Sequence, residues 1–234
     1  MLSAILLSGL VFKEYISNFH FALKEIEKEI TEFFDDKGFP KTRNSDDLIN
    51  ISKYFILIKE CVKDAQLLIP DFLEIIINKN LTCLKNLEAP NKMMPLFNGA
   101  NETDLEDYHN YLFNLNLKSK KDHQITGEIF LLKNKKDFLF FDTGKVPKKK
   151  YSQNYQLGPL SFEYFFDQDK VVTNCGYGSN ISEKAATLSK LTSAHSCLCL
   201  NETSLLKFEK SRFFCWKDCW KSCRSRFRFI TRSG

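Results

Sequence analysis

The chain has 234 residues, of which 43% are hydrophobic and 27% are charged. This is the composition of an ordinary folded protein and excludes an intrinsically disordered chain. The net charge of +5 is concentrated near the C-terminus, where seven basic residues and one acid lie in residues 211–234. A solvated surface with a basic tail is therefore favoured over a nucleic-acid-binding surface.

The first segment, residues 1–12, is apolar but carries no basic residue before its hydrophobic run. A bilayer-spanning helix needs roughly 20 residues, and a signal peptide needs a basic start and a small-residue cleavage site. We therefore expect a buried helix here.

Three longer helices are predicted next. Apolar residues from Phe19 to Phe34 recur at helical spacing, and Gly38 and Pro40 end that segment. Ser45 is expected to cap the second helix, and Pro70 introduces the third, over residues 71–87. The expected inward faces are Leu48, Ile51, Phe55 and Ile58 on the second helix, and Phe72, Ile75, Ile76 and Leu84 on the third.

The pattern changes in the second half of the chain. Residues 89–100 contain helix breakers, residues 108–117 predict a last helix or linker, and residues 118–122 form a charged boundary. Two hairpins are then predicted, from residues 129–132 with 138–141 and from 160–166 with 171–173. Further strands are expected at 191–200 and 205–208. Alternation in the second hairpin indicates that Leu160, Phe162 and Tyr164 share a buried face.

These elements predict an α+β fold in three parts. The helical part covers residues 1–120, the antiparallel β-domain covers residues 121–210, and the basic tail with three Cys and both Trp covers residues 211–234. The eight Cys show no C-x-x-C spacing, so buried free thiols are favoured over a disulfide framework or a zinc site. The tail is expected to pack poorly.

Generic catalytic motifs such as a P-loop, G-x-S-x-G or H-E-x-x-H are absent. Six short strings instead occur in an order and spacing that resemble the heparinase II/III-like polysaccharide lyases. They lie at residues 36–45, 95–100, 141–144, 160–163, 172–176 and 192–196. The resemblance implies the end of an α/α toroid followed by an incomplete antiparallel β-sandwich.

The resemblance also implies a chemistry. These bacterial lyases degrade acidic polysaccharides such as glycosaminoglycans or alginate by β-elimination, which makes them carbon–oxygen lyases. The reaction needs a base, an acid for the leaving oxygen and donors that neutralise the uronate carboxylate. The family places such enzymes in the periplasm or cell envelope, whereas this chain shows no export signal, so the compartment stays open. Some members hold a divalent metal in the sandwich.

Carried over by position, the catalytic residues would be His195, Gln156 and Asp47, and the substrate-binding residues Arg43, Asn44, Asn98 and Asn154. The family's toroid Tyr corresponds to Asp47, its two sandwich His to about Asn154 and Gln156, and its metal-binding Asp to Asn174. Amides donate hydrogen bonds but do not exchange protons near neutral pH. No metal ligand and no cofactor are assigned, because most of the ligand positions are replaced.

Three functions remain open at this point. The first is a lyase acting on an acidic polysaccharide, the second a glycan-binding protein without turnover, and the third a polyanion-binding protein that uses the basic tail. Alternative roles also stand for single residues: Arg43 as a surface ion pair, Asn44 as a helix cap and His195 as a satisfied interior histidine. We expect an acidic polysaccharide as partner, no membrane span, and little or no lyase activity, with the oligomeric state open.

Overall fold

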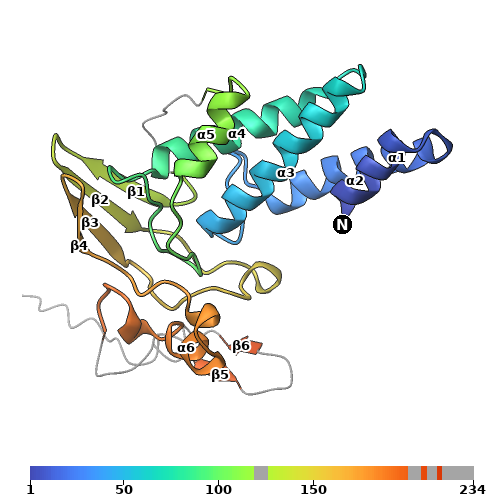
Figure 1. The fold of residues 1–234 in the computed structure, drawn as a ribbon. Coiled ribbons are helices and arrows are strands. Elements are labelled where there is room, and N and C mark those ends of the chain that lie inside the picture. The colour runs from blue at the N-terminus through green and yellow to red at the C-terminus, as the bar shows by residue number, and fades with distance from the viewer. Residues whose placement is uncertain (119–125, 200–206, 210–214, 218–234) are drawn as a thin grey trace, which may run out of the picture.

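The computed structural model describes residues 1–118, 126–199, 207–209 and 215–217. Figure 1 shows a group of helices from the first half of the chain beside an antiparallel sheet from the second half. The predicted α+β organisation is confirmed. Residues 119–122 of the proposed boundary and most of the tail lie outside the described residues.

The helical part contains five α-helices and one 3₁₀ turn in the described residues. They are α1 (Leu2–Val11), η1 (Lys13–Tyr15), α2 (Ile16–Phe33), α3 (Ser45–Asp64), α4 (Asp71–Leu87) and α5 (Glu106–Asn114). The predicted third helix, residues 71–87, agrees with α4. The predicted cap of α3 is wrong by one residue: Asn44 is the N-cap, and its side chain accepts a hydrogen bond from the Asp46 amide.

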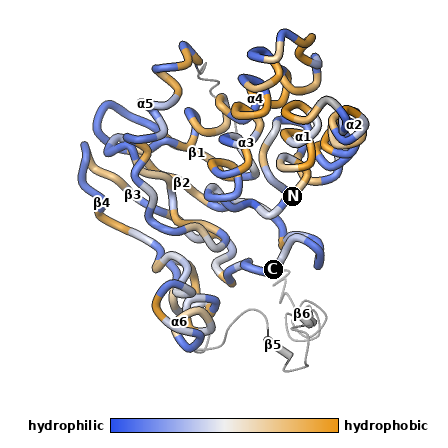
Figure 2. The backbone as a smooth tube through the Cα atoms, turned by 45° about the vertical axis from the view of Figure 1, so that its right-hand side comes forward, coloured by the Kyte–Doolittle hydropathy of each residue, from blue (hydrophilic) through white to orange (hydrophobic). Residues whose placement is uncertain are grey.

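Apolar side chains from α1 to α5 form one core with the inner face of the sheet. Leu6 of α1 is fully buried, which agrees with the predicted helix, although Val11 at its end is 70% exposed. On α4 the prediction for Ile75 is wrong, because that side chain is 54% exposed while its neighbour Ile76 is buried. Figure 2 shows hydrophobic residues recurring along α1 to α4, whereas the loops beside the sheet are largely hydrophilic.

The sheet has four strands in the order β1 (Ile129–Lys133), β2 (Asp137–Asp142), β3 (Phe162–Phe166) and β4 (Asp169–Val172). Every neighbouring pair is antiparallel, with Leu131 opposite Phe140 and Phe140 opposite Glu163. Both predicted hairpins are confirmed. No helix in the described residues is long and apolar enough to cross a membrane.

The predicted buried face of β3 is wrong. Leu160 is 58% exposed, while Ser161, Glu163 and Phe165 are buried at 2%, 0% and 0% exposure. Glu163 accepts hydrogen bonds from the backbone amides of Leu96 and Asn174, at 3.1 and 2.9 Å. Its carboxylate also lies 3.3 Å from the Lys170 ammonium. These donors come from the segment before the sheet, from β4 and from the segment after β4, and they compensate the burial of the acid.

The segment after β4 is mainly irregular. It contains η3 (Gly178–Asn180), α6 (Glu183–Leu188) and η4 (Thr192–Ala194), while η2 (Lys149–Tyr151) precedes β3. The predicted strand at 191–200 is therefore wrong, and His195 lies just beyond η4 in an extended conformation. The short β5 (Lys207–Glu209) pairs with β6 (Cys215–Lys217), so one piece of the tail is a strand.

Within the described residues, Cys61, Cys83, Cys175 and Cys197 are free thiols. Of these, Cys83 is buried, and burial raises the pKa of its thiol to about 12. Cys175 and Cys199 are exposed, so the expectation of buried thiols is wrong for those two.

Candidate functional site

Arg43 is the side chain that ties the helical part to the sheet. It is 5% exposed and follows the turn at Pro40 with φ of 60°. Its guanidinium forms an ion pair with Asp142 at the end of β2 and donates to the carbonyls of Gly127 and Lys145, both at 3.2 Å. The ion pair expected as an alternative is therefore present, but it is buried instead of lying on the surface.

Because Gly144 has no side chain, the Arg43 guanidinium can lie against its backbone. A Cβ at this position would come within 2.1 Å of the guanidinium carbon. Sequence reasoning assigned no role to Asp142, although the residue stands in the string at 141–144 that carries the family resemblance. That string was the signal in the sequence that could have pointed to Asp142.

Asn98 forms hydrogen bonds to both residues of this ion pair. Its amide nitrogen donates to the Arg43 carbonyl and to the second carboxylate oxygen of Asp142, both at 3.3 Å. The side chain is 4% exposed. Arg43 and Asn98, both expected to bind substrate, are thus brought together, and both are bonded to protein groups.

The first turn of α3 carries two partly buried acids. Burial raises the pKa of Asp47, and its carboxylate accepts a 2.6 Å hydrogen bond from the Thr42 hydroxyl. Burial also raises the pKa of Asp46, which accepts hydrogen bonds from the backbone and side-chain amides of Asn101. Asp46 and Asn101, which the sequence did not single out, join α3 to the segment that reaches the sheet.

Gln156 connects the same segment, at Gly99, to two other parts of the chain. It is 2% exposed, and its oxygen accepts from the Gly99 amide at 3.0 Å. Its nitrogen donates to the carbonyls of Gly176 and Ser189, at 2.7 and 3.0 Å. The side chain therefore joins three separate segments and has no proton to exchange at neutral pH.

His195 shares one of these acceptors. Its Nε2 lies 3.0 Å from the Ser189 carbonyl oxygen, and because a carbonyl only accepts, Nε2 carries the proton. Burial lowers the pKa of the imidazole, which is therefore neutral near pH 7, with Nδ1 as an acceptor. The backbone of Gly158 also packs closely against the His195 ring, because a Cβ at Gly158 would come within 2.9 Å of it.

The remaining candidates lie apart. Asn154 is exposed, and its backbone rather than its side-chain amide packs against Gly99. Asn44 caps α3, as the alternative for that residue anticipated. The structure therefore forms two connected groups, one of Arg43, Asn98 and Asp142 and another of Gln156, Ser189 and His195, while Asp47 is bonded to Thr42.

The family's divalent metal does not fit the residues present. Asn174 is 2% exposed, and its oxygen accepts from the Ser196 amide at 3.1 Å, while its nitrogen has no hydrogen-bond partner among the described residues. An amide nitrogen and the Nε2–H of His195 cannot ligate a cation. Within the described residues no three His, Cys, Asp or Glu side chains are grouped to hold a metal. Hydrogen bonds through Gln156 and His195 connect these loops instead.

A basic cavity of about 460 Å³ opens beside Arg43. It lies between the segment after α2 and the segment that follows β2. Five basic side chains and two acidic ones line it: Lys41, Arg43, Lys145, Lys148 and Lys150, with Asp35 and Glu128.

Comparison with known proteins agrees with this arrangement. The family model described as "Heparinase II/III-like, C-terminal" matches residues 126–217. The family recognised in the sequence is confirmed for that part, which holds Asp142, Gln156 and His195.

Solved structures extend the similarity across the helical part. The chain is 14% identical to heparan sulfate lyase HepC from Pedobacter heparinus, with a TM-score of 0.70. The match covers 90% of this chain and 39% of the HepC chain. The heparinase III BT4657 gene product is 14% identical with a TM-score of 0.70, and that match covers 87% of this chain and 37% of the other. At this identity the likeness shows the fold, a heparinase-type helical domain joined to a β-domain. No curated protein matches the sequence.

Proposed function

We propose that this chain binds an acidic polysaccharide at the basic cavity between its helical and β-parts, without cleaving it. The observation that carries the proposal is the cavity itself, formed where two parts of a polysaccharide-lyase fold meet. A uronate carboxylate or a sulfate group offers the negative charge that clustered ammonium groups recognise.

The lysines of the cavity differ in their availability. Lys41 donates to the carbonyls of Thr31 and Glu32 at the end of α2, and Lys150 pairs with the Glu32 carboxylate at 2.8 Å. Lys145 and Lys148 are exposed, and in the described part of the chain neither ammonium has a carboxylate within ion-pair distance. These two are therefore the residues we assign to the anion.

The cavity also offers an apolar surface. Val146 is 39% exposed beside Pro147, and Tyr151 is held in place by its hydroxyl, which donates to the Glu32 carbonyl at 2.6 Å. Such a surface suits the C–H face of a sugar ring, while the lysines take its acidic substituents. Binding sites commonly combine apolar walls with a few placed polar groups.

Turnover lacks support from the described residues. β-Elimination needs groups that transfer protons, and general acid–base help typically contributes about 10²–10⁴-fold to the rate. At the positions carried over from the family, Gln156 transfers no proton, and Asp47 is a carboxylate that would repel a uronate. Arg43 is bonded to Asp142 and two carbonyls. Recognition without elimination is the function that these contacts favour.

One observation favours lyase activity as a second candidate. His195 is neutral near pH 7 and keeps Nδ1 as an acceptor, which is the protonation state of a general base. A lyase reading requires that this nitrogen reaches the proton next to the uronate carboxylate. His195→Ala would then abolish product formation.

The binding proposal is tested by titrating heparan sulfate and alginate oligosaccharides into the wild-type chain and into Lys145→Ala/Lys148→Ala. We expect affinity to fall about tenfold, the loss of one strong charge-assisted interaction. The matched control is Lys135→Ala/Lys184→Ala, which removes the same charge from exposed positions outside the cavity. Equal losses in the two double variants would show nonspecific charge attraction and contradict the proposal.

A further inference from the structure

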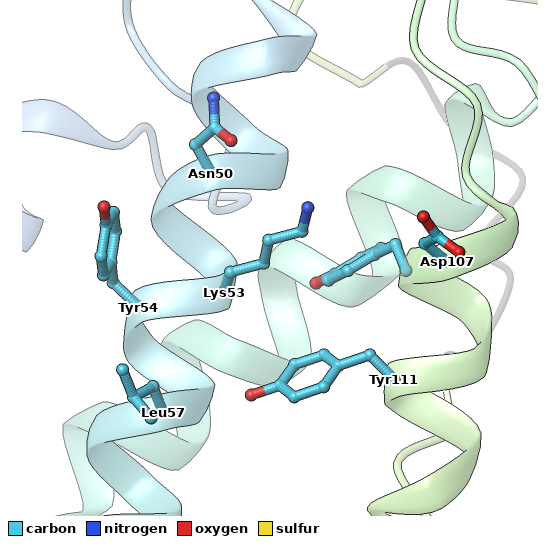
Figure 3. A pocket seen from close by; sticks show the side chains of 7 residues that line it. Asn50, Lys53, Tyr54, Leu57, Asp107 and Tyr111 are labelled. Carbon is cyan, nitrogen blue, oxygen red and sulfur yellow. The ribbon is translucent and has the colours of Figure 1, made fainter.

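A second hollow, of about 470 Å³, lies on the helical part between α3 and α5. Its α3 wall consists of Asn50, Lys53, Tyr54 and Leu57, which are spaced three or four residues apart and therefore share one face of the helix. Figure 3 shows Lys53 extending from α3 toward α5 and Tyr111 extending from α5 toward α3.

The two tyrosines on α5 are held in place, Tyr108 buried and Tyr111 partly buried, and they face exposed side chains on α3. The Tyr108 hydroxyl hydrogen-bonds to the Ser52 hydroxyl at 2.7 Å, and the rings of Tyr108 and Tyr111 stack with centroids 6.3 Å apart. On the facing helix, Tyr54 is 56% exposed and Leu57 is 41% exposed. Fixed aromatic rings offer contact area at a low entropic cost.

Polar side chains surround this aromatic surface. The Lys53 ammonium lies 5.4 Å from the centre of the Tyr108 ring and, in the described residues, has no carboxylate within ion-pair distance. Asn50 and Asp107, both exposed, lie on α3 and α5 respectively. The hollow therefore presents one cation, one amide and one carboxylate around apolar rings.

We infer that this hollow binds one sugar ring of the acidic polysaccharide, with Tyr54 and Tyr111 against the ring and Lys53 at its carboxylate or sulfate. The inference rests on the proposed function and adds a second contact site on the helical part. Asn50 and Asp107 supply the acceptors and the donor that sugar hydroxyls require. A sugar satisfies these polar groups, whereas a packed apolar segment would bury them without partners.

The inference is tested with the full chain and size-defined heparan sulfate oligosaccharides. Tyr54→Ala and Tyr111→Ala should each lower the affinity about fivefold or more, as truncated aromatic contacts do. Tyr54→Phe and Tyr111→Phe keep the rings and should bind nearly as the wild type does. Tyr54 is largely exposed, so its replacement tests the site without a change in folding.

Salt and a second variant separate this site from the basic cavity. The tyrosine contribution should persist at raised salt, while the contribution of Lys145 and Lys148 should decline because exposed charges are screened. If Lys145→Ala/Lys148→Ala weakens binding and both tyrosine variants bind normally, the inference is overturned and the proposed function stands. If only the tyrosine variants weaken binding, the aromatic site stands and the basic cavity fails. No binding by the wild type would contradict both.

Discussion

Replacing Arg43 with Met tests the buried connection between the helical part and the sheet. The change removes the ion pair with Asp142 and two hydrogen bonds to carbonyls. Loss of one partner of a buried pair typically costs about 3–5 kcal/mol, because the other charge is left uncompensated. Asp142 keeps two donors, the Gly144 amide and Asn98. We therefore expect the lower end of that range, about 3 kcal/mol.

The assay is urea unfolding followed by far-ultraviolet circular dichroism, with the unfolding free energy taken from the midpoint and slope. Lys145→Met is the matched control, since it removes a neighbouring but exposed charge and should change stability by less than about 0.5 kcal/mol. Adding Asp142→Asn to Arg43→Met should recover part of the loss by removing the unpaired charge. A loss below about 1 kcal/mol for Arg43→Met, or no recovery in the double variant, would refute the buried pair.

Three further predictions concern the group around Gln156. Gln156→Ala should lower the unfolding free energy by about 2–4 kcal/mol, because it leaves the buried Gly99 amide without its acceptor and removes two further hydrogen bonds to carbonyls, and an unchanged denaturation midpoint would contradict this. The pKa of His195 is lowered by folding, so the unfolded chain takes up the proton more readily and stability should fall as pH drops below 6.5. His195→Gln should flatten that part of the stability profile, and parallel profiles would refute the assignment. Chelators should leave the melting temperature unchanged, whereas Gln156→His with Asn174→Asp should make it rise with added zinc; a chelator-sensitive wild type would show that a metal binds.

Local patterns in the sequence predict the elements of this fold well. Residues 71–87 carry helical spacing after Pro70 and form α4 with those bounds. Both hairpins of the sheet follow from strand-like runs separated by short polar turns. The residues that carry these signals lie close together in the sequence, so a short stretch of sequence is enough to predict each element.

Burial set by distant partners could not be predicted in this way. Glu163 turns inward because amides from residues 96 and 174 converge on it, and no neighbouring residue indicates that. Alternation in residues 191–200 predicted a strand, whereas His195 and Cys197 bond locally to carbonyls of Ser189 and Thr192. An alternating sequence forms a strand only where an edge is available for pairing.

The contacts of the candidate residues could not be predicted from the sequence. Arg43, Asn98 and Gln156 form hydrogen bonds between the two parts of the chain, whereas His195 bonds to Ser189 within the second part. What each side chain bonds to depends on residues far along the chain, and Asp142, the partner of Arg43, had no assigned role. Lys145 and Lys148 of the basic cavity belong to the irregular segment after β2, which carries no motif.

The central claim is recognition of an acidic polysaccharide without cleavage. The most direct measurement incubates the wild-type chain with heparan sulfate and with alginate at concentrations where binding has been established, and follows the ultraviolet absorbance of the unsaturated uronate product. An active lyase of the same family serves as control. The account predicts bound polysaccharide and no absorbance above background. Robust product formation that disappears in His195→Ala would contradict it and establish His195 as the base of an active lyase.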